Sequence, residues 1–366
     1  MVALPAMDAH PRHRPVVRWL VTGCVLIACM VAIGGITRLT GSGLSITEWK
    51  PIMGALPPMN DAEWQEAFEK YKQIPEYTLK NRLMDLEGFK AIFFWEYLHR
   101  NWGRLMGLVF LLPFLHFLRR GWLRGWLLRR SLAILVGGGL VGALGWFMVM
   151  SGLSEDPDVS HFRLAIHLCA AFAVFLLVLW TVLDLQHGRR AWRSDGSAAG
   201  RWSRLLLPLL LLQVVYGAFT AGLDAGRIYN TWPLMHGAFM PENVHAFGDL
   251  VKDLTDHRDG VQFVHRNLAW LVAAACIALV VALRHDVRVA RTGHWLVATV
   301  VLQFALGVAT LLTTVQIALG VLHQLGALLL LSVLLALIHA TGRAVPAQAA
   351  DEVAHVGPHT VGHGRE

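Results

Sequence analysis

The sequence predicts an all-α, polytopic membrane protein whose eight transmembrane helices form two parallel four-helix repeats. Three observations lead to this fold class. Of the 366 residues, 55% are hydrophobic and only 16% are charged, which is too few charges for the surface of a soluble domain. The apolar residues form eight runs long enough to cross a bilayer, each needing about 20 residues as a helix. The second half of the chain also repeats motifs of the first half.

The eight apolar runs define the predicted helices. Backbone polar groups in lipid must hydrogen-bond within their own segment, so we expect helices rather than strands. The first run continues to about Ile36 without a small-residue cleavage site, so we interpret it as a retained span, not a signal peptide. The second run is the least obvious, because Glu96, His99, Arg100 and Arg104 crowd its start. The expected spans are residues 16–37, 92–118, 131–150, 162–183, 204–223, 261–283, 294–312 and 315–340.

Basic residues predict the orientation of these helices. Arginines cluster before the first helix and in the segments after the second, fourth and sixth helices, which all lie on one side. Lys and Arg are in excess on the cytoplasmic side of membranes. We therefore expect an integral, multi-pass protein of a bacterial or mitochondrial inner membrane, with both termini in the cytoplasm or matrix. The net charge of +7 then reflects topology, and nucleic-acid binding is not expected.

Two long loops, residues 38–91 and 224–260, are expected on the opposite, outer side, and each opens with a related motif. Gly35, Gly43, Trp49 and Gly54 align with Gly217, Gly226, Trp232 and Gly237 if one small gap is allowed, and His99-Arg100-Asn101 matches His265-Arg266-Asn267. Because each copy has an even number of helices, both have the same orientation, related by a pseudo-two-fold axis along the membrane normal. We divide the chain into a cytoplasmic tail (1–15), two four-helix repeats (16–190 and 204–341) and a disordered cytoplasmic tail (342–366).

Four histidines occupy matching depths near the outer ends of the even-numbered helices: His99, His167, His265 and His323. Imidazole is a common axial ligand of heme iron, and helix bundles hold such cofactors between facing helices. A small residue follows each histidine four positions later, on the same helix face, where a flat macrocycle needs room; these are Gly103, Ala171, Ala269 and Ala327. The pattern predicts two bis-histidine heme sites. A lone membrane histidine is often only a packed polar group, but four at repeat-related positions favour function.

Other histidines lack this pairing. We interpret His116, His294 and His339 as structural, and the sequence leaves the role of His161 open. The four cysteines, Cys24, Cys29, Cys169 and Cys276, all fall inside apolar runs and form no C-x-x-C pair, so we expect small buried hydrophobic residues, not a disulfide or zinc site.

The two predicted sites differ at one position. Glu96 precedes His99 by three residues and shares its helix face, whereas Gln262 takes the matching place before His265. This asymmetry predicts that one site performs chemistry and the other holds a cofactor. A buried carboxylate can transfer protons, so Glu96 is the candidate catalytic residue. The alternative is that Glu96 only forms an ion pair with Arg100.

An arginine directly follows one histidine of each predicted pair. Arg100 and Arg266 are candidates for contacts with heme propionates, because Arg pairs well with carboxylates. They are equally good candidates for anchoring the outer helix ends, and the sequence does not decide between these roles.

With these motifs in place, the sequence resembles the heme A synthase family, in its mitochondrial and proteobacterial branch. The resemblance covers nearly the whole chain outside the tails and is carried by GGITRLTGSGLSITEWKPIMGALPP (34–58), FFWEYLHRNWGRLMG (93–107), AIHLCAAF (165–172), TWPLMHGAFMPE (231–242), VQFVHRN (261–267) and GVLHQLGALLL (320–330). Some members carry cysteine pairs in the outer loops, and this sequence has none there.

The resemblance implies an oxidoreductase that converts the C8 methyl group of heme O to a formyl group, giving heme A for cytochrome oxidase. It implies heme b as cofactor on His265 and His323, the substrate heme O on His99 and His167, and an essential glutamate at Glu96. Heme O synthase and an electron donor such as a ferredoxin are the candidate partners, besides the lipid bilayer. Two alternatives stay open: a diheme, quinol-linked electron-transfer cytochrome b without heme modification, and a heme transporter or chaperone.

Overall fold

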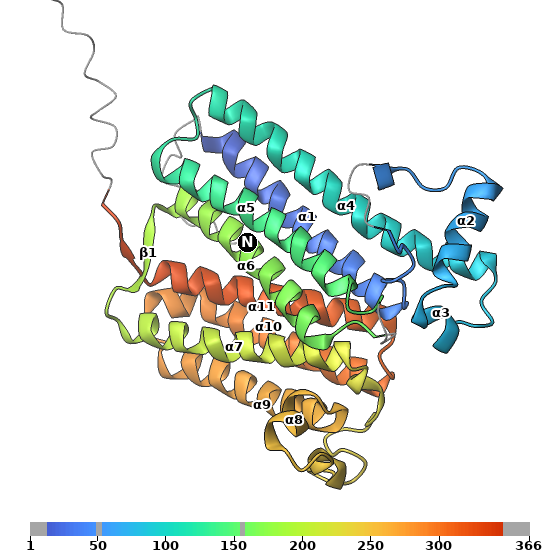
Figure 1. The fold of residues 1–366 in the computed structure, drawn as a ribbon. Helices are drawn as coiled ribbons and strands as arrows, with labels where there is room; N and C mark the ends of the chain where they lie inside the picture. Colours follow the sequence, from blue (N-terminus) through green and yellow to red (C-terminus); the bar gives the residue numbers. More distant parts are fainter. Residues whose placement is uncertain (1–12, 49–52, 154–157, 347–366) are drawn as a thin grey trace, which may run out of the picture.

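Eight long apolar helices run side by side through the protein (Figure 1). The computed structural model describes residues 13–48, 53–153 and 158–346. Each of the eight helices is long and apolar enough to cross a membrane, so the predicted all-α, polytopic membrane fold is confirmed. Their bounds are α1 (His13–Leu39), α4 (Leu86–Arg119), α5 (Gly125–Val149), α6 (His161–His187), α7 (Ala198–Gly222), α9 (Arg258–Ala282), α10 (Val287–Leu312) and α11 (Ile317–Ala340).

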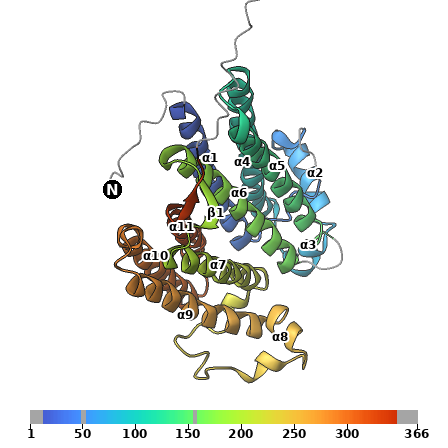
Figure 2. The same ribbon diagram turned by 90° about the vertical axis from the view of Figure 1, so that its left-hand side faces the viewer.

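The long helices contact one another in two groups of four, as the rotated view in Figure 2 also indicates. In the first group, α1 packs on α4 and α6, and α5 packs on the same two helices. In the second group, α9 packs on α7 and α10, and α11 packs on the same two helices. Contacts of α6 with α7 and of α1 with α11 join the groups, and one cluster of buried apolar side chains extends through both.

The division into repeats 16–190 and 204–341 stays a prediction. Of the two predicted tails, residues 1–12 and 347–366 lie outside the described residues, as does Trp49 of the first motif.

Two short strands, β1 (Arg190–Ser194) and β2 (Gly342–Ala344), pair antiparallel at one end of the bundle. Neither strand was expected, and β2 falls at the start of the segment predicted as a disordered tail. The carbonyl of Thr341 accepts a hydrogen bond from the backbone N–H of Asp195 at 3.1 Å, and Arg189 accepts one from Val345, also at 3.1 Å. These backbone bonds order the chain beyond α11 and tie it to the segment between the two helix groups.

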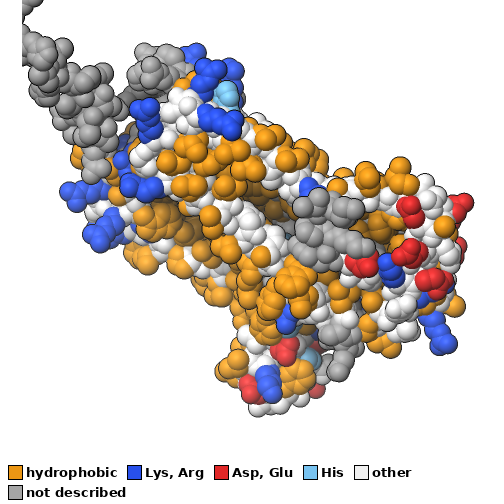
Figure 3. Space-filling model, turned by 45° about the horizontal axis from the view of Figure 1, so that its top comes forward, with side chains coloured by type: hydrophobic (Ala, Val, Ile, Leu, Met, Phe, Trp, Pro, Cys, Tyr) orange, Lys and Arg blue, Asp and Glu red, His pale blue; other side chains and the backbone are white. Residues whose placement is uncertain are grey.

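The loops at the other end carry the remaining short elements. They are α2 (Asp61–Tyr71), α3 (Pro75–Leu79), α8 (Leu250–Thr255) and the 3₁₀ turns η1 (Met53–Ala55), η2 (Ala225–Arg227) and η3 (Glu242–His245). Figure 3 shows Lys and Arg gathered at the end where β1 lies, Asp and Glu around α2, and hydrophobic side chains between them. This is the charge distribution from which the orientation was predicted.

Helix α2 is held against the N-terminal end of α4, at the end of the bundle opposite β1, which is called the outer end here after the predicted orientation. The side chain of Asn60 caps α2 by accepting a hydrogen bond from the backbone N–H of Glu63 at 3.0 Å. Phe68 and Tyr71 are buried, and their rings lie 5.1 and 5.2 Å from the ring of Phe89 on α4. The apolar face of α2 is therefore covered by protein, which fixes the first outer loop above the helices of the first group.

Candidate heme-binding site

One cavity of 1610 Å³ contains all four predicted ligand histidines in its wall: His99 on α4, His167 on α6, His265 on α9 and His323 on α11. Pockets for one small ligand have volumes of roughly 300–1,000 Å³, so this cavity has space for more than one. The four small residues predicted to make room for a macrocycle, Gly103, Ala171, Ala269 and Ala327, also line it.

In the first helix group, each histidine ring packs edge-on against a glycine of a neighbouring helix. A Cβ placed on Gly34 of α1 would lie 2.9 Å from Cε1 of His99. A Cβ placed on Gly145 of α5 would lie 3.0 Å from Cε1 of His167. Any larger residue would displace these rings, so the two glycines set how deep each imidazole sits.

The second group repeats this arrangement. A Cβ on Gly217 of α7 would lie 3.3 Å from Cε1 of His265, and one on Gly307 of α10 would lie 2.8 Å from Cε1 of His323. The sequence analysis paired none of the four glycines with a histidine, and it singled out Gly217 only as part of the repeated motif. A signal was present, because each lies in the first or third long helix of its group, but glycines are common in these helices and their partners are distant in sequence.

The packing also corrects the alignment of the two motifs. The sequence comparison set Gly35 against Gly217 and needed a gap. Gly34 and Gly217 hold the same position against a histidine, and pairing them removes the gap. Gly35 faces the seam between the groups instead, where a Cβ would lie 2.7 Å from Oε1 of Gln324.

The imidazoles of His265 and His323 face each other across the cavity. Their ring centres are 6.4 Å apart and their planes are nearly perpendicular, at 88°. Metal–imidazole nitrogen bonds are about 2 Å long, so an iron held between two such rings keeps their centres about 6 Å apart. This pair fits bis-histidine ligation of a heme.

The ring nitrogens of the four histidines make few contacts with protein. The Nδ1 atom of His99 is buried and has no hydrogen-bond partner within the described residues, whereas Nδ1 of His265 lies 3.2 Å from Nε2 of Gln213. Among the described residues, no group of three or more His, Cys, Asp or Glu side chains could hold a bare metal ion. Paired imidazoles fit a metal that brings its own equatorial ligands, as heme does.

Arg100 anchors the first outer loop. Its guanidinium donates to the carbonyl oxygens of Ile46 at 2.7 Å and Glu48 at 3.0 Å. These residues follow α1 and belong to the first motif, so the contact holds the loop over the outer end of the cavity.

Arg266 does the same for the second loop. It donates to the carbonyl oxygens of Thr231 at 2.8 Å, Pro233 at 3.0 Å and Tyr229 at 3.5 Å. Tyr229 and Thr231 take the places of Ile46 and Glu48 once the motifs are aligned without a gap. The geometry favours the anchoring role for both arginines, although both line the cavity. A propionate contact stays a prediction.

Glu96 is buried and lines the same cavity. Its Oε1 accepts a hydrogen bond from Arg100 at 2.5 Å, and its Oε2 accepts from the Ser45 hydroxyl and the Ile46 backbone N–H, both at 2.7 Å. The ion pair that was the alternative to a catalytic role is therefore present. A carboxylate has about four acceptor sites, so Oε1 still has a free lone pair. Gln262, the counterpart, only donates to the Tyr229 carbonyl at 3.5 Å.

A second carboxyl group lines the cavity from the first outer loop. Glu76 is 7% exposed and its Oε2 accepts a hydrogen bond from the Tyr71 hydroxyl at 3.1 Å. Asn81 in turn donates to the Tyr71 oxygen at 2.7 Å. Burial raises the pKa of Glu76 to about 7. Sequence reasoning missed this group, because nothing in the local sequence signals that it is buried.

Among the described residues, the histidines other than these four do not line the cavity. His161 is buried between the helix groups, with its Nε2 2.9 Å from the carbonyl oxygen of Thr255. His339 is buried at the β1 end, with its Nε2 3.0 Å from Oδ1 of Asp184. Both have structural partners. All four cysteines are free thiols within the helices.

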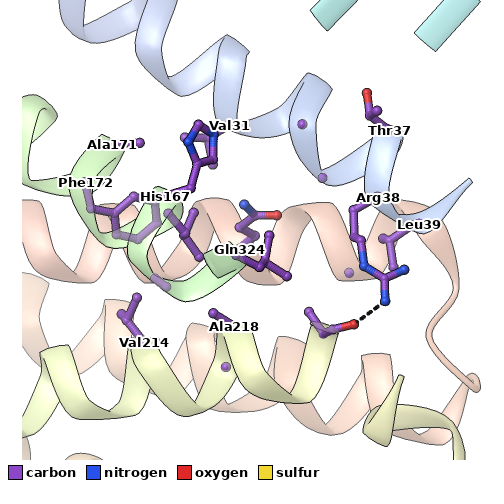
Figure 4. Close-up of a pocket in the computed structure, with 18 of the residues that line it drawn as sticks. Val31, Thr37, Arg38, Leu39, His167, Ala171, Phe172, Val214, Ala218 and Gln324 are labelled. Carbon is purple, nitrogen blue, oxygen red and sulfur yellow. Dashed lines mark hydrogen bonds between the residues drawn. The ribbon is translucent and has the colours of Figure 1, made fainter. Parts of the chain in front are cut away.

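The seam between the two helix groups is part of the cavity wall. Figure 4 shows side chains of α1, α6, α7 and α11 converging there, among them His167, Ala171, Ala218 and Gln324. Arg38, at the end of α1, donates to the Ala221 carbonyl at 2.7 Å. The two histidine pairs therefore share one continuous cavity.

Comparisons with known proteins agree with this arrangement. The sequence profile of the COX15-CtaA family, described as cytochrome oxidase assembly protein, matches residues 17–335. A heme A synthase of Flavobacterium johnsoniae is 44% identical over 89% of this chain and 98% of its own length. Heme A synthases of Caulobacter vibrioides and Rhodospirillum centenum are 46% and 47% identical, each over 88% of this chain and over 94% and 87% of their own lengths.

No solved structure matches the chain. The family profile covers six of the long helices in full, most of α1 and α11, and all four histidines of the cavity. The chain belongs to the COX15-CtaA family of cytochrome oxidase assembly proteins.

Proposed function

We propose that this protein is a heme A synthase, a membrane oxidoreductase that converts the C8 methyl group of heme O to the formyl group of heme A. The observation that carries the proposal is the convergence of two histidine pairs on one cavity, in a chain whose relatives are named heme A synthase. One heme would be the resident cofactor and the other would be the substrate.

The pair on α9 and α11 is the proposed cofactor site. His265 and His323 would ligate heme b, and their spacing of 6.4 Å suits an iron between them. Gly217 and Gly307 leave room for the rings. A bound heme b would supply one-electron redox chemistry, while the protein supplies ligation and orientation.

The pair on α4 and α6 is the proposed substrate site. His99 and His167 would hold the iron of heme O, with Gly34 and Gly145 setting the depth of the two rings. Two successive hydroxylations would each consume one dioxygen, two electrons from the donor and two protons, and each would release one water. The resulting gem-diol would then lose water to form the aldehyde.

Glu96 is the proposed proton-handling group at this site. Glu96 lines the cavity on the face of α4 that also carries His99, and its carboxyl group would exchange a proton with the substrate hydroxyl. Arg100 holds the first outer loop over the site and keeps the carboxylate in place. An electron donor such as a ferredoxin would reduce the cofactor, and heme O synthase would deliver the substrate.

We place the loops with α2, α3 and α8 on the outer side of a bacterial inner membrane (or its mitochondrial equivalent). The basic end with β1 would then face the cytoplasm or matrix. Both heme sites would lie near the outer face, because the histidines lie toward that end of their helices.

The proposal is tested in cells that make heme O but no heme A. Expression of this chain should make heme A, or a hydroxylated heme O, appear among the extracted pigments. Extraction of heme b alone would favour the diheme electron carrier. Unmodified heme O as the only additional pigment would favour a transporter or chaperone.

A further inference from the structure

The contact between α4 and α5 differs from its counterpart between α9 and α10. The histidine contacts show which positions of these helices correspond. On α4 and α9, His99 corresponds to His265. On α5 and α10, Gly145, which packs against His167, corresponds to Gly307, which packs against His323. With this alignment, Gly142 takes the place of Phe304. Gly138 and Gly139 take the places of Val300 and Val301, and Arg104 takes the place of Trp270.

Aromatic rings fill the seam between α9 and α10. The ring centres of Trp270 and Phe304 are 4.6 Å apart, in an edge-to-face arrangement. Trp232 of the outer loop stacks on Trp270 at 5.9 Å. These rings line the cavity and occupy the space between α9 and α10 on that side of the second helix group.

Among the described residues, which do not include Trp49, the counterpart of Trp232, the seam between α4 and α5 has no such filling. A Cβ placed on Gly138, Gly139 or Gly142 would meet no atom within 4 Å, and all three glycines line the cavity. Across the seam, Leu108 and Leu111 also line the cavity, yet they are 55% and 37% exposed on the outside of the helix pair. The cavity of the proposed substrate site therefore reaches the lipid-facing surface between α4 and α5, which lie next to each other in Figure 2.

Two further observations indicate that the space belongs to a ligand. The imidazoles of His99 and His167, the proposed ligands of the substrate iron, line the same cavity. Within the part of the chain that the structure describes, the seam is also hollow only in the half assigned to the substrate, although the second half has the corresponding helices and the same histidine–glycine packing.

We propose that the α4–α5 seam is a lateral slot that takes the isoprenoid side chain of the substrate heme from the bilayer. This inference rests on the proposed function. Heme O carries a long apolar hydroxyalkyl chain that heme b lacks. A slot lined mainly by glycine and leucine, with Arg104 as its charged residue, open to lipid and continuous with the macrocycle site, suits that chain. The closed seam at Trp270 and Phe304 suits a heme without one.

The slot determines which heme binds at which histidine pair. Heme O and heme b present the same iron and macrocycle to the ligating histidines. His99 and His167 alone therefore do not distinguish the two hemes. The apolar chain adds buried surface only where a slot receives it. Gly142 is therefore a specificity-determining residue, because a phenylalanine there would rebuild the filling of the second half.

The test uses the Gly142→Phe variant of the full-length protein, purified in detergent with its resident heme. Heme O and heme b are each titrated into the protein, and binding is followed by absorbance. We expect an unchanged resident heme spectrum, a loss of heme O affinity of at least about tenfold, and a smaller loss for added heme b. Leu140→Phe on α5 is the matched control, because Leu140 is 60% exposed and does not line the cavity.

If the Gly142→Phe protein does not accumulate, Gly138→Val is used in the same titration. This variant introduces the valine that the second half has at the matching position, and valine is smaller than phenylalanine. If Gly142→Phe lowers the affinities for heme O and heme b equally, the slot proposal is wrong. If it lowers neither affinity, the proposal is also wrong, and the space holds only lipid. Failure of the wild-type protein to bind heme O or to form heme A would instead reject the proposed function, so the two failures are distinguishable.

Discussion

Gly307 of α10 lies so close to the imidazole of His323 on α11 that a Cβ in its place would come within 2.8 Å of Cε1. The ring cannot keep its position beside a larger residue, since real Cβ contacts are longer than this. The glycine is thus as much a part of the proposed heme b site as the histidine it faces.

Gly307→Ala should therefore shift or broaden the heme b absorbance bands and lower the heme content of the purified protein. Gly217→Ala should have a weaker effect, because its Cβ would lie 3.3 Å from His265. Gly23→Ala is the control, since its Cβ would meet only Val178, at 4.0 Å. Absorbance spectra of reduced protein measure all three. A wild-type spectrum for Gly307→Ala would contradict the packing role.

A second prediction separates the two roles of Glu96. If Glu96 handles protons, Glu96→Gln should lower heme A formation per bound heme b by roughly 10²–10⁴-fold. Arg100→Met should destabilise the protein, because it leaves the buried carboxylate without its ion-pair partner. The folded fraction of Arg100→Met should nevertheless keep more turnover than Glu96→Gln.

The double variant completes this experiment. The alternative is that Glu96 only anchors the loop through Arg100. In that case turnover per folded molecule should fall equally in Glu96→Gln, in Arg100→Met and in the double variant Glu96→Gln/Arg100→Met. Proteolysis of the first outer loop reports anchoring independently of activity. Equal turnover in all three variants would reject proton handling by Glu96.

A third prediction concerns Glu76, whose pKa is raised by burial from 4.5 to about 7. Between these values the folded protein binds one more proton at this group than the unfolded chain does. Stability is therefore fully present below about pH 4.5 and falls as the pH rises through about 7. Glu76→Gln cannot ionise, so it should lose less of its Tm between about pH 5 and pH 8.

Thermal unfolding in detergent at both pH values provides the measurement for Glu76. Glu87→Gln is the control, because the Glu87 side chain is 77% exposed. If Tm depends on pH identically in Glu76→Gln and the wild-type protein, the pKa of Glu76 is not raised in the folded state.

A fourth prediction tests the orientation. Leu83→Cys, in the first outer loop, places a thiol at a position that is 99% exposed. It should react with a membrane-impermeant thiol reagent in intact spheroplasts, whereas Arg120→Cys, after α4, should react only once the membrane is opened. The wild-type protein provides the background, because all four native cysteines lie within the helices. The opposite labelling pattern would invert the topology.

The sequence was sufficient for the parts of the fold that depend on local pattern. Hydropathy located all eight helices, since a membrane span is recorded in one continuous run. Equal depth in the helices singled out His99, His167, His265 and His323, and the structure brings them to one cavity.

Features that depend on which helices meet could not be predicted. Gly34 faces His99, and Gly35, its neighbour, faces Gln324; nothing in the local sequence distinguishes them. The strand β2 depends on backbone pairing with β1, some 150 residues earlier in the chain. The anchoring role of Arg100 required the position of Ile46, which is set by how the outer loop folds.

The central claim is that His265 and His323 hold the resident heme b, while His99 and His167 receive the substrate. The most direct measurement is the amount and identity of heme extracted from purified His323→Ala and His99→Ala proteins, with His294→Ala as control because His294 is exposed and lies outside the cavity wall. We predict that His323→Ala loses heme b, and that His99→Ala keeps heme b but contains neither heme O nor heme A. Retention of heme b by His323→Ala, or its loss from His99→Ala, would contradict this account.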